Sequence, residues 1–341
     1  MKKILSIVLT IAVLTGCSKN DIVGETTPVE IAFGDTFIDN ITKSIDPSFT
    51  KNNLNEFKVW GFVDNYTGKM FDGELVWQNT EGKWAYTNKQ FWLPNNSYYF
   101  YALSNNYAKV TQAVGDAAKL GLGNVLFSNN EGKNDLIYAS VTRTTTDLSS
   151  KNEYDNVKFT FNHLLSKVRF TFQNGFGNKS ISIAVKDVTM EVPKSAEIDL
   201  AVAQWSDNAK WTNHSNEKSV LSFGNMVGKD EMNESAEALI INNETPAPGA
   251  VSNYERFVIP SGREQVYTVF FTADVYVNDL KVYTQAFSTK ITGVELGIGM
   301  AYNFKATLGP DNIGPNGQPL EPIKFKVEKV NGWTQGSDKN I

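Results

Sequence analysis

The segment VKFTFNHLLSKVRFTF, residues 157–172, decides the fold class because apolar and polar side chains alternate through most of it. The alternation runs through VKFTF at 157–161 and again through KVRFTF at 167–172. Successive side chains of a strand point to opposite faces, so a period of two residues gathers the apolar ones on one face. The segment therefore predicts two half-buried β-strands.

The same period recurs along the rest of the chain. Three further alternating sets are Val29, Ile31 and Phe33; Phe57, Val59 and Gly61; and Ile323, Phe325 and Val327. Turn-forming Gly, Pro and Asn residues separate such runs, as at 94–96 and 260–262. The pattern predicts an all-β protein made of sandwiches. The Ala-rich segment Val110–Gly121 is the one good helix candidate, and we expect it to be a loop insertion.

Residues 57–107 are rich in aromatic side chains, and some of these belong to a predicted hairpin. In ELVWQNTEGKWAY, residues 74–86, a four-residue turn at Asn79–Gly82 would pair Trp77 with Trp84 on one face. Such rings could form a platform that stacks on sugars, or they could fill the core of a sandwich. We favour the core, because aromatic side chains dominate burial in β domains.

The segment LTGC, residues 14–17, carries the only cysteine of the chain, Cys17. Two lysines and the apolar run Ile4–Leu14 precede it, which is the pattern of a secretory signal peptide. That run is too short to cross a hydrocarbon core about 30 Å thick, so a membrane anchor would have to be covalent. The order aliphatic, Thr, Gly, Cys resembles the lipobox of bacterial lipoproteins. It implies that residues 1–16 are removed and that Cys17 carries acyl chains such as palmitate, in preference to a buried or redox-active thiol.

Length and composition limit what the mature chain can be. Without residues 1–16 it has the length of about two domains. A single cysteine forms no internal disulfide, so burial of its 41% hydrophobic residues must hold the fold. Acidic residues outnumber basic ones by 37 to 32, and loss of Lys2 and Lys3 widens that excess. We therefore expect no nucleic acid partner.

Residues suited to catalysis or metal binding are scarce. His163, at a predicted strand end, and His214, in the polar loop WTNHSNE, are the only histidines. Together with one acylated thiol they do not supply the ligands of a zinc site or a Cys/His dyad. No strand–turn–helix nucleophile elbow is present, although residues alone leave a Ser/His/Asp triad open. We therefore expect no enzyme activity, no cofactor and no metal.

Several blocks taken together resemble the fimbrillin-like family, the lipoprotein-derived type V pilin subunits of Gram-negative anaerobes of the gut and mouth. The blocks are the lipobox, VEIAF with the following Thr42-Lys43, NEFKVWGFV (55–63), KQFWLPNNSYYFYALS (89–104), NDLIYASVT (134–142), the segment 157–172, AYNFKATLG (301–309) and IKFKVEKVNGW (323–333). They follow one another through nearly the whole mature chain. The block FNHLLSKV at 161–168, beside DLIYA, is the most distinctive.

The resemblance implies two tandem transthyretin-like β-sandwich domains that meet near Asn162–Lys167. The implied division is a signal peptide at 1–16, a linker at 17–27, an N-terminal sandwich at 28–162, a C-terminal sandwich at 163–312 and a C-terminal strand segment at 313–341. The terminal strands would be available for donor-strand exchange.

The resemblance also implies a route of assembly. In such pilins a trypsin-like protease cuts the exported precursor after a basic residue behind the first strand, and that strand is lost. The open groove, with unpaired backbone groups and apolar pockets, then accepts a strand of the next subunit. In this chain the displaced strand would carry Val29, Ile31 and Phe33, and the donor strand Ile323, Phe325 and Val327. The alternative is that both ends are permanent strands of one sandwich.

The processing position departs from the family pattern. The family site is usually Arg, whereas the first Arg of this chain is Arg143. Lys43 and Lys51 are the only basic residues of the relevant loop, and we predict cleavage after Lys43. A chain that is not cut there would remain a lipidated anchor or an unpolymerised surface protein.

These observations predict a structural subunit, anchor or tip protein of a fimbrium that self-assembles and supports adhesion. The expected location is the outer membrane and the cell surface, with Cys17 in the lipid. The expected partners are other copies or related pilin subunits and a host or bacterial surface ligand. The alternative is a glycan-binding surface lipoprotein. Inward-pointing Trp side chains favour the first interpretation, and an exposed row of coplanar rings would favour the second.

Overall fold

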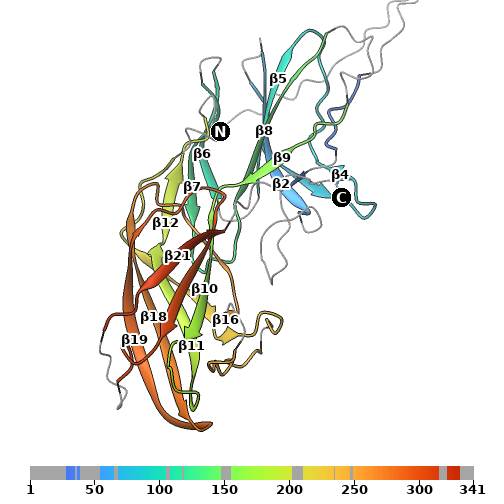
Figure 1. Cartoon of the computed structure of the whole chain (residues 1–341). Helices are drawn as coiled ribbons and strands as arrows, with labels where there is room; N and C mark the ends of the chain where they lie inside the picture. Colours follow the sequence, from blue (N-terminus) through green and yellow to red (C-terminus); the bar gives the residue numbers. More distant parts are fainter. Residues whose placement is uncertain are drawn as a thin grey trace, which may run out of the picture.

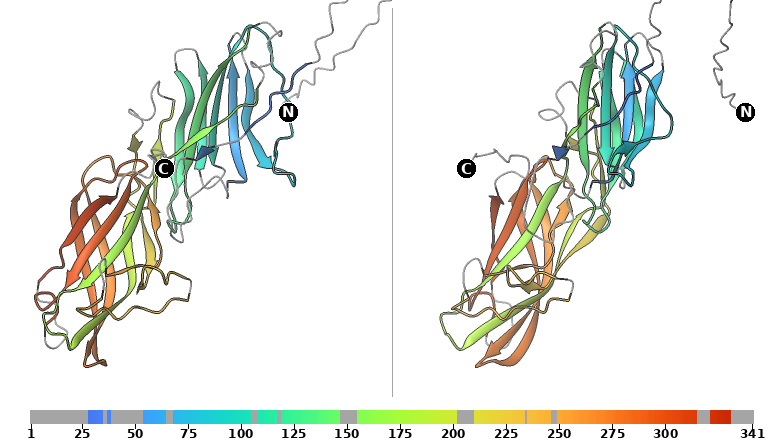
Figure 2. Two further views of the ribbon diagram at one scale, coloured as in Figure 1. Left: turned by 45° about the vertical axis from the view of Figure 1, so that its right-hand side comes forward. Right: turned by 90° about the vertical axis from the view of Figure 1, so that its right-hand side faces the viewer.

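The protein is seen here as a computed structural model that describes residues 28–34, 37–38, 54–64, 68–104, 108–116, 119–146, 155–201, 210–233, 235–245, 249–314 and 321–330. Within these ranges every regular element is a β-strand, which confirms the all-β prediction. Among the same residues no helix is long and apolar enough to span a membrane. The molecule is elongated, with one group of sheets above the other (Figure 1, Figure 2).

A seven-stranded sheet forms the first half of the chain. In spatial order its strands are β1 (Phe37–Ile38), β9 (Thr160–His163), β8 (Ile137–Thr144), β5 (Ser97–Ser104), β2 (Glu56–Val63), β3 (Lys69–Gln78) and β4 (Trp84–Ala85). All neighbours are antiparallel except β1 and β9, which run parallel. The predicted alternation of Phe57 and Val59 is present in β2, where both side chains are fully buried.

Two facing sheets form the second half. The first contains β15 (Met226–Val227), β16 (Ala250–Ser252), β10 (Ser166–Asn174), β20 (Ala301–Leu308) and β21 (Phe325–Val330), with β17 (Arg256–Val258) also paired to β10. The second contains β14 (Lys218–Gly224), β11 (Ile181–Pro193), β18 (Gln265–Val277) and β19 (Leu280–Val294). Phe170 and Phe172 of β10 lie in one core with Val269 and Phe271 of β18. The apolar side chains of KVRFTF thus face the core of a sandwich, as the alternation predicts.

A fourth sheet joins the two halves, which the sequence did not predict. It contains β13 (Trp211–Thr212), β12 (Ser195–Ile198), β7 (Lys119–Ser128) and β6 (Ala108–Asp116). β7 comes from the expected N-terminal sandwich and β12 from the C-terminal one, and they pair from Ser195 opposite Ser128 to Ile198 opposite Val125. A buried cluster that includes Trp60, Phe62, Leu122 and Ile198 packs beside this sheet. The two halves are therefore bound by a shared sheet as well as by the chain crossing.

Two local predictions were wrong. The described residues of Val110–Gly121 are not helical, because 110–116 belong to β6 and 119–121 to β7, which pair antiparallel. A short isolated helix is marginal, and the long-range pairing of β7 with β12 outweighs local propensity. In the other hairpin Gln78 faces Trp84, and Trp77 faces Ala85. Asn79 therefore faces Lys83, to whose carbonyl its N–H donates at 2.8 Å, and the Asn79 side chain accepts hydrogen bonds from the N–H groups of Glu81 and Lys83.

The chain crosses from the first half to the second between His163, the last residue of β9, and Ser166, the first of β10. His163 is 1% exposed, and its Nδ1 lies 2.7 Å from Oδ2 of the buried Asp135. Leu164 donates its N–H to the carbonyl of Leu136. The two most distinctive sequence blocks, FNHLLSKV and DLIYA, therefore meet at the crossing. The domain boundaries expected at 162 and 163 stay a prediction, and β7 and β12 connect the two halves elsewhere.

Candidate assembly site at the N-terminal segment

Residues 28–34, called the N-terminal segment below, cross the first half without forming a regular strand. Glu30 makes an antiparallel bridge with Phe91, and Phe33 makes a parallel bridge with Val157. The N–H of Ile31 donates to the carbonyl of Gln90 at 2.9 Å. Farther along, the N–H of Gly34 donates to the carbonyl of Val157 at 2.9 Å. The segment changes partners within four residues, so neither ladder continues and the predicted strand at 29–33 is only a pair of bridges.

The apolar side chains of the segment fill the core of the first half. Ile31 is fully buried and Phe33 is 4% exposed. The ring of Phe33 lies among four others, with centroid distances of 6.1 Å to Phe57, 5.8 Å to Phe71, 5.5 Å to Tyr86 and 5.9 Å to Phe159. Burial of two side chains of this size contributes about 3–6 kcal/mol. The third residue of the expected set, Val29, is 38% exposed and does not belong to this core.

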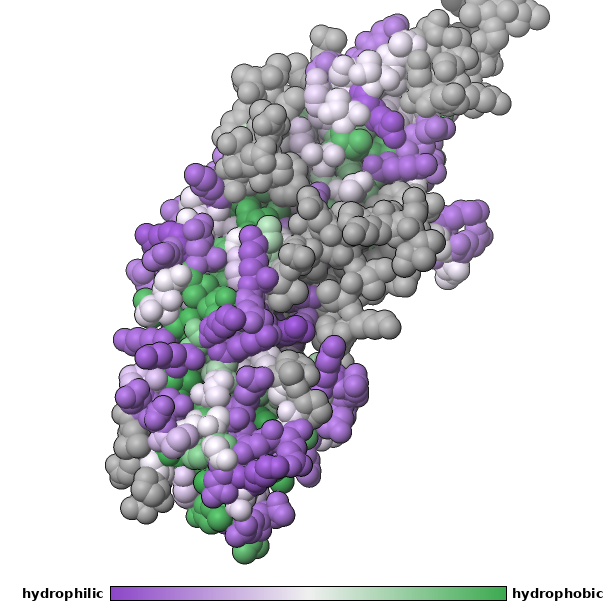
Figure 3. Space-filling model, in the orientation of Figure 1, coloured by the Kyte–Doolittle hydropathy of each residue, from purple (hydrophilic) through white to green (hydrophobic). Residues whose placement is uncertain are grey.

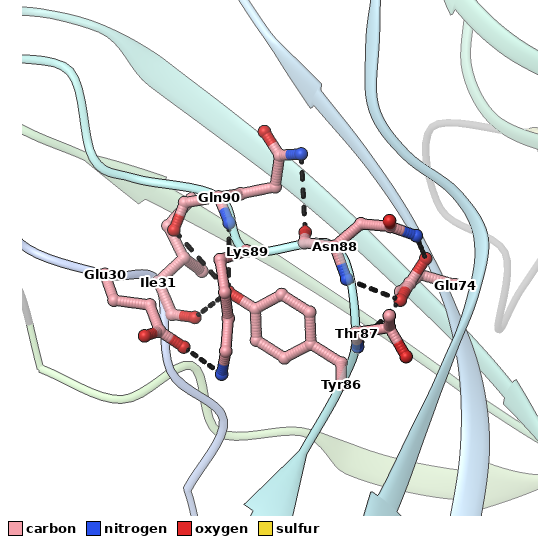
Figure 4. A network of polar contacts seen from close by, with 8 residues as sticks. All are labelled: Glu30, Ile31, Glu74, Tyr86, Thr87, Asn88, Lys89 and Gln90. Atoms are coloured by element: carbon pink, nitrogen blue, oxygen red, sulfur yellow. Dashed lines mark hydrogen bonds and ion pairs between the residues drawn. The ribbon is translucent and has the colours of Figure 1, made fainter.

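A polar rim fixes the edge of the N-terminal segment (Figure 4). The Tyr86 hydroxyl donates to the carbonyl of Ile31 at 2.6 Å. Burial raises the pKa of Tyr86 to about 12, so the hydroxyl keeps its proton at neutral pH. Lys89 Nζ lies 2.5 Å from Oε1 of Glu30 and 4.6 Å from the centre of the Tyr86 ring.

The loop that carries Tyr86 and Lys89 is itself held by Glu74 of β3 (Figure 4). The Glu74 carboxylate accepts the N–H of Thr87 at 3.0 Å, the N–H of Asn88 at 3.1 Å and the Asn88 amide at 2.7 Å. Burial alone would raise the pKa of Glu74, but these hydrogen bonds outweigh it and hold the pKa below its ordinary value. The hydrogen bonds that hold this loop to Glu74 do not involve the N-terminal segment.

The predicted donor strand occupies the other half of the molecule. β21 pairs antiparallel with β20, from Ala306 opposite Phe325 to Ala301 opposite Val330. Ile323 is 4% exposed, and the ring of Phe325 lies 5.7 Å from Phe170 and 5.8 Å from Phe172.

Val327 packs half-buried on the same core, while Lys324 and Lys326 are exposed as the alternation predicts. Glu328 departs from that pattern, being half-buried with its carboxylate 2.5 Å from Lys305 Nζ. The N-terminal segment and β21 thus lie in different halves, and they do not close a single sandwich together. β21 is the last strand of its sheet among the described residues, with β20 as its one strand partner.

The other predicted site residues are dispersed or lie elsewhere. Cys17 and Lys43 fall outside the described residues. His214 Nε2 lies 2.9 Å from the carbonyl oxygen of Pro260, whereas His163 pairs with Asp135. Across the described ranges no group of three or more His, Cys, Asp or Glu residues is placed to hold a metal ion.

The aromatic side chains of residues 57–107 are mostly interior. Trp60, Trp92 and Tyr98 are at most 6% exposed, and Trp77 and Trp84 are half-buried against the first core. In the described part of this region Phe91, at 44%, is the one aromatic side chain among the exposed large hydrophobic residues. The interpretation of these rings as core is confirmed, and no observation favours the sugar platform.

Sequence reasoning missed the polar rim. Tyr86 and Lys89 lie in a loop and Glu74 lies on β3, so no single periodicity marks the three residues together. The one available signal was the run TNK after Tyr86, a turn composition between two apolar stretches.

Comparison with known proteins gives three results. The fimbrillin-like family profile matches residues 42–328, which is most of the chain. A fimbrial protein from Bacteroides vulgatus is 15% identical, with a TM-score of 0.53, and the match covers 89% of this chain and 99% of that one. At that identity the likeness shows a shared fold.

Two cell adhesion proteins, from Bacteroides ovatus and Bacteroides uniformis, are 13% and 11% identical with TM-scores of 0.46 and 0.49. These matches cover 90% and 91% of this chain and 98% and 100% of the other chains. No curated protein matches the chain.

Proposed function

Because the chain belongs to the fimbrillin-like family, whose members are non-enzymatic subunits of fimbriae, we propose that its copies assemble by exchange of a terminal strand and support adhesion at the cell surface. The N-terminal segment would be the removable occupant of a groove in the first half. β21 of a neighbouring copy would replace it. One observation carries this proposal. Four aromatic rings enclose Phe33, although the segment to which Phe33 belongs is bound to the rest of the protein only by isolated β-bridges.

The N-terminal segment has the properties of a removable plug. Its backbone contributes isolated bridges rather than a continuous ladder, while Ile31 and Phe33 supply its apolar contacts. Loss of the segment would uncover the rings of Phe57 and Phe159, and it would leave the N–H groups of Trp92 and Val157 without their present acceptors. An exposed apolar groove with a free backbone edge is a site for strand addition.

β21 has the properties of the strand that moves. It lies at the end of its sheet, and every second side chain from Ile323 to Val327 is apolar. In the groove of a neighbour, two of these side chains would take the places of Ile31 and Phe33. Departure of β21 would uncover Phe170 and Phe172 in its own subunit. Exchange is therefore driven by the difference in free energy between the contacts of β21 in the neighbour's groove and its contacts with β20 and the core of its own subunit.

The proposal includes the route to the surface. Acylation of Cys17 would hold the precursor in the outer membrane, and cleavage after Lys43 would free the mature subunit from that anchor and from its plug. A copy that escapes cleavage would stay in the membrane as the base of a fibre. Cys17 and Lys43 are both assigned from the sequence and from the family resemblance.

A disulfide that ties β21 to β20 tests the exchange. Lys305 and Lys326 lie directly opposite each other on these two strands. In a chain lacking residues 1–17, Lys305→Cys with Lys326→Cys leaves two thiols and no others. Deletion of β21 is a poorer test, because Ile323 belongs to the home core.

Mild trypsin treatment of the parent chain should produce a ladder of multimers that resist SDS. The oxidised double variant should stay monomeric after the same cleavage, and dithiothreitol should restore its assembly. Each single cysteine variant serves as the control. An oxidised, cleaved double variant that polymerises like the parent would refute the assignment of β21 as the donor.

A further inference from the structure

The far end of the second half carries an exposed apolar pocket. The pocket has a volume of about 690 Å³, and its lining includes Phe176, Ile181, Val277, Val282, Tyr283 and Ile313. Three apolar side chains of the β18–β19 hairpin remain open to solvent there: Val277 is 36% exposed, Leu280 72% and Val282 51%. Figure 1 shows this hairpin at the lower end of the molecule, and Figure 3 shows hydrophobic surface at the same end. The pocket and these side chains are called the tip below.

The turn between β18 and β19 does not explain why the side chains around it are apolar. Asn278 and Asp279 form the turn with φ angles of 49° and 62°, a conformation that Asn and Asp adopt readily. The turn therefore needs no apolar neighbours, and Leu280 contributes nothing to the core at 72% exposure. Contiguous apolar surface around a pocket indicates a contact with another molecule.

A second exposed apolar group lies at the opposite end of the molecule. Phe91 is 44% exposed and Leu93 is 45% exposed. The carbonyl of Leu93 accepts a hydrogen bond from Thr145, immediately after the end of β8 at Thr144. The other end of β8, at Ile137, pairs with His163 at the crossing between the halves. Eight residues of strand separate these ends by roughly 25 Å, so Phe91 and Leu93 lie at the outer end of the first half.

The tip lies at the end of the second half that is remote from the crossing. β10 starts at the crossing with Ser166 and ends at Asn174, whose side chain donates to the carbonyl of Ile181 beside the pocket. The elongated molecule (Figure 2) thus carries exposed apolar side chains toward both ends, in two different groups.

We propose that the tip of one copy docks on the outer end of the next, with Phe91 and Leu93 entering the pocket. Two unlike patches at opposite ends make a head-to-tail contact that does not close on itself, and such contacts build filaments. Phe91 and Leu93 also remain after cleavage at Lys43, so the contact is available to the mature subunit. This inference deepens the proposed function and rests on it.

The connection to β21 supports a second copy as the occupant. The segment before β21 is fastened at the tip, because Glu321 donates its N–H to the carbonyl of Asp311 at 2.8 Å and Ile313 lines the pocket. A released β21 would therefore extend from the tip. Phe91 bridges Glu30 of the N-terminal segment, so the groove vacated in the next copy begins beside the surface on which the tip docks.

The tip contact would act together with the exchanged strand. A few exposed side chains do not provide the roughly 1,000 Å² of a stable interface. A weak contact at the point of attachment does, however, raise the effective concentration of β21 at the groove. We therefore expect the tip to govern the rate of assembly and the stiffness of the fibre more than the stability of each joint.

The test compares a tip variant, Leu280→Lys with Val282→Lys, and a control, Val220→Lys. Val220 is 56% exposed on β14, away from both ends. Each cleaved protein is assayed for uptake of a synthetic peptide of residues 321–332 and for the rate of polymer growth. The tip variant should take up the peptide as the parent does but polymerise at least tenfold more slowly, while the control behaves like the parent. Equal growth rates for the tip variant and the parent would overturn the tip contact.

A charge swap identifies the partner surface. Leu93→Glu alone should slow growth, and its addition to the tip variant should restore growth at low salt, with the recovery lost at high salt as charges are screened. Failure of that rescue would refute the outer end as the partner. If the parent itself takes up no peptide, strand exchange fails, and the tip is then tested in the uncut chain. The uncut parent should associate weakly and in a concentration-dependent way in sedimentation experiments, and the uncut tip variant should not. Association of the tip variant, or no association of the parent, would overturn the contact.

Discussion

Phe33→Ala should weaken the N-terminal segment strongly while leaving the mature subunit unchanged. The side chain is 4% exposed and touches the rings of Phe57, Phe71, Tyr86 and Phe159. Removal of a buried Phe side chain costs about 3–5 kcal/mol, which includes the cavity that it leaves. For a chain of this size each kcal/mol lowers the melting temperature by roughly 2–4 °C, so we expect a decrease of about 10 °C in the precursor.

The same substitution should accelerate loss of the segment after cleavage. Each 1.4 kcal/mol is a factor of ten in an equilibrium constant, so 3–5 kcal/mol favours detachment by about a hundredfold to several thousandfold. Once residues before the cut have left, the parent and the variant have identical sequences and should melt identically. That convergence distinguishes a removable plug from a permanent part of the core.

The assay is calorimetry of the uncut and cut proteins, with release of the N-terminal peptide followed by mass spectrometry. Val29→Ala is the matched control, because Val29 lies on the same segment but is 38% exposed and outside the core. Its melting temperature should stay within about 2 °C of the parent, as expected for a surface substitution. Equal destabilisation by both substitutions would refute the reasoning from burial, and failure of the cut proteins to converge would refute the plug.

Three further predictions concern other residues. Cys17→Ala should release the protein from membranes or leave it as an unprocessed precursor, and unchanged partitioning into detergent would contradict the lipid assignment. Tyr86→Phe leaves the buried carbonyl of Ile31 without its donor, so it should destabilise the uncut chain by about 1–3 kcal/mol and the cut chain much less, as measured by urea unfolding. Asp274 is 3% exposed, and its carboxylate lies 2.6 Å from Lys186 Nζ and 3.8 Å from Lys281 Nζ. Burial would raise the pKa of Asp274, but the two amines and the Thr284 hydroxyl outweigh burial and lower that pKa. The unfolded state therefore takes up this proton first as pH falls, so stability should drop below about pH 4, and Asp274→Asn should lower the stability at pH 7 and flatten that drop in acid urea titrations.

Strand positions and the identity of the core could be read from the sequence. A period of two predicts β2, β10 and β21 and the burial of Phe57, Phe170 and Ile323, because alternation along a strand is imposed locally by backbone geometry. The junction near Asn162–Lys167 was implied by the family resemblance and not by periodicity; in the structure Asp135 and His163 form a buried pair there. The candidate site was located only in part: Ile31 and Phe33 were expected, but Val29 is outside the core.

Tertiary structure decided everything that depends on pairing between distant residues. The segment Val110–Gly121 became a hairpin because β7 pairs with β12, about seventy residues later in the chain. Trp60 and Phe62, which alternation assigns to the solvent face of β2, are buried because the sheet shared by both halves covers that face. The polar rim and the apolar patches at the two ends combine side chains of loops with side chains of strands, such as Glu74 of β3 and Val282 of β19, so no single periodicity marks them. Local sequence sets which way a side chain points, and only the assembled sheets determine what it meets.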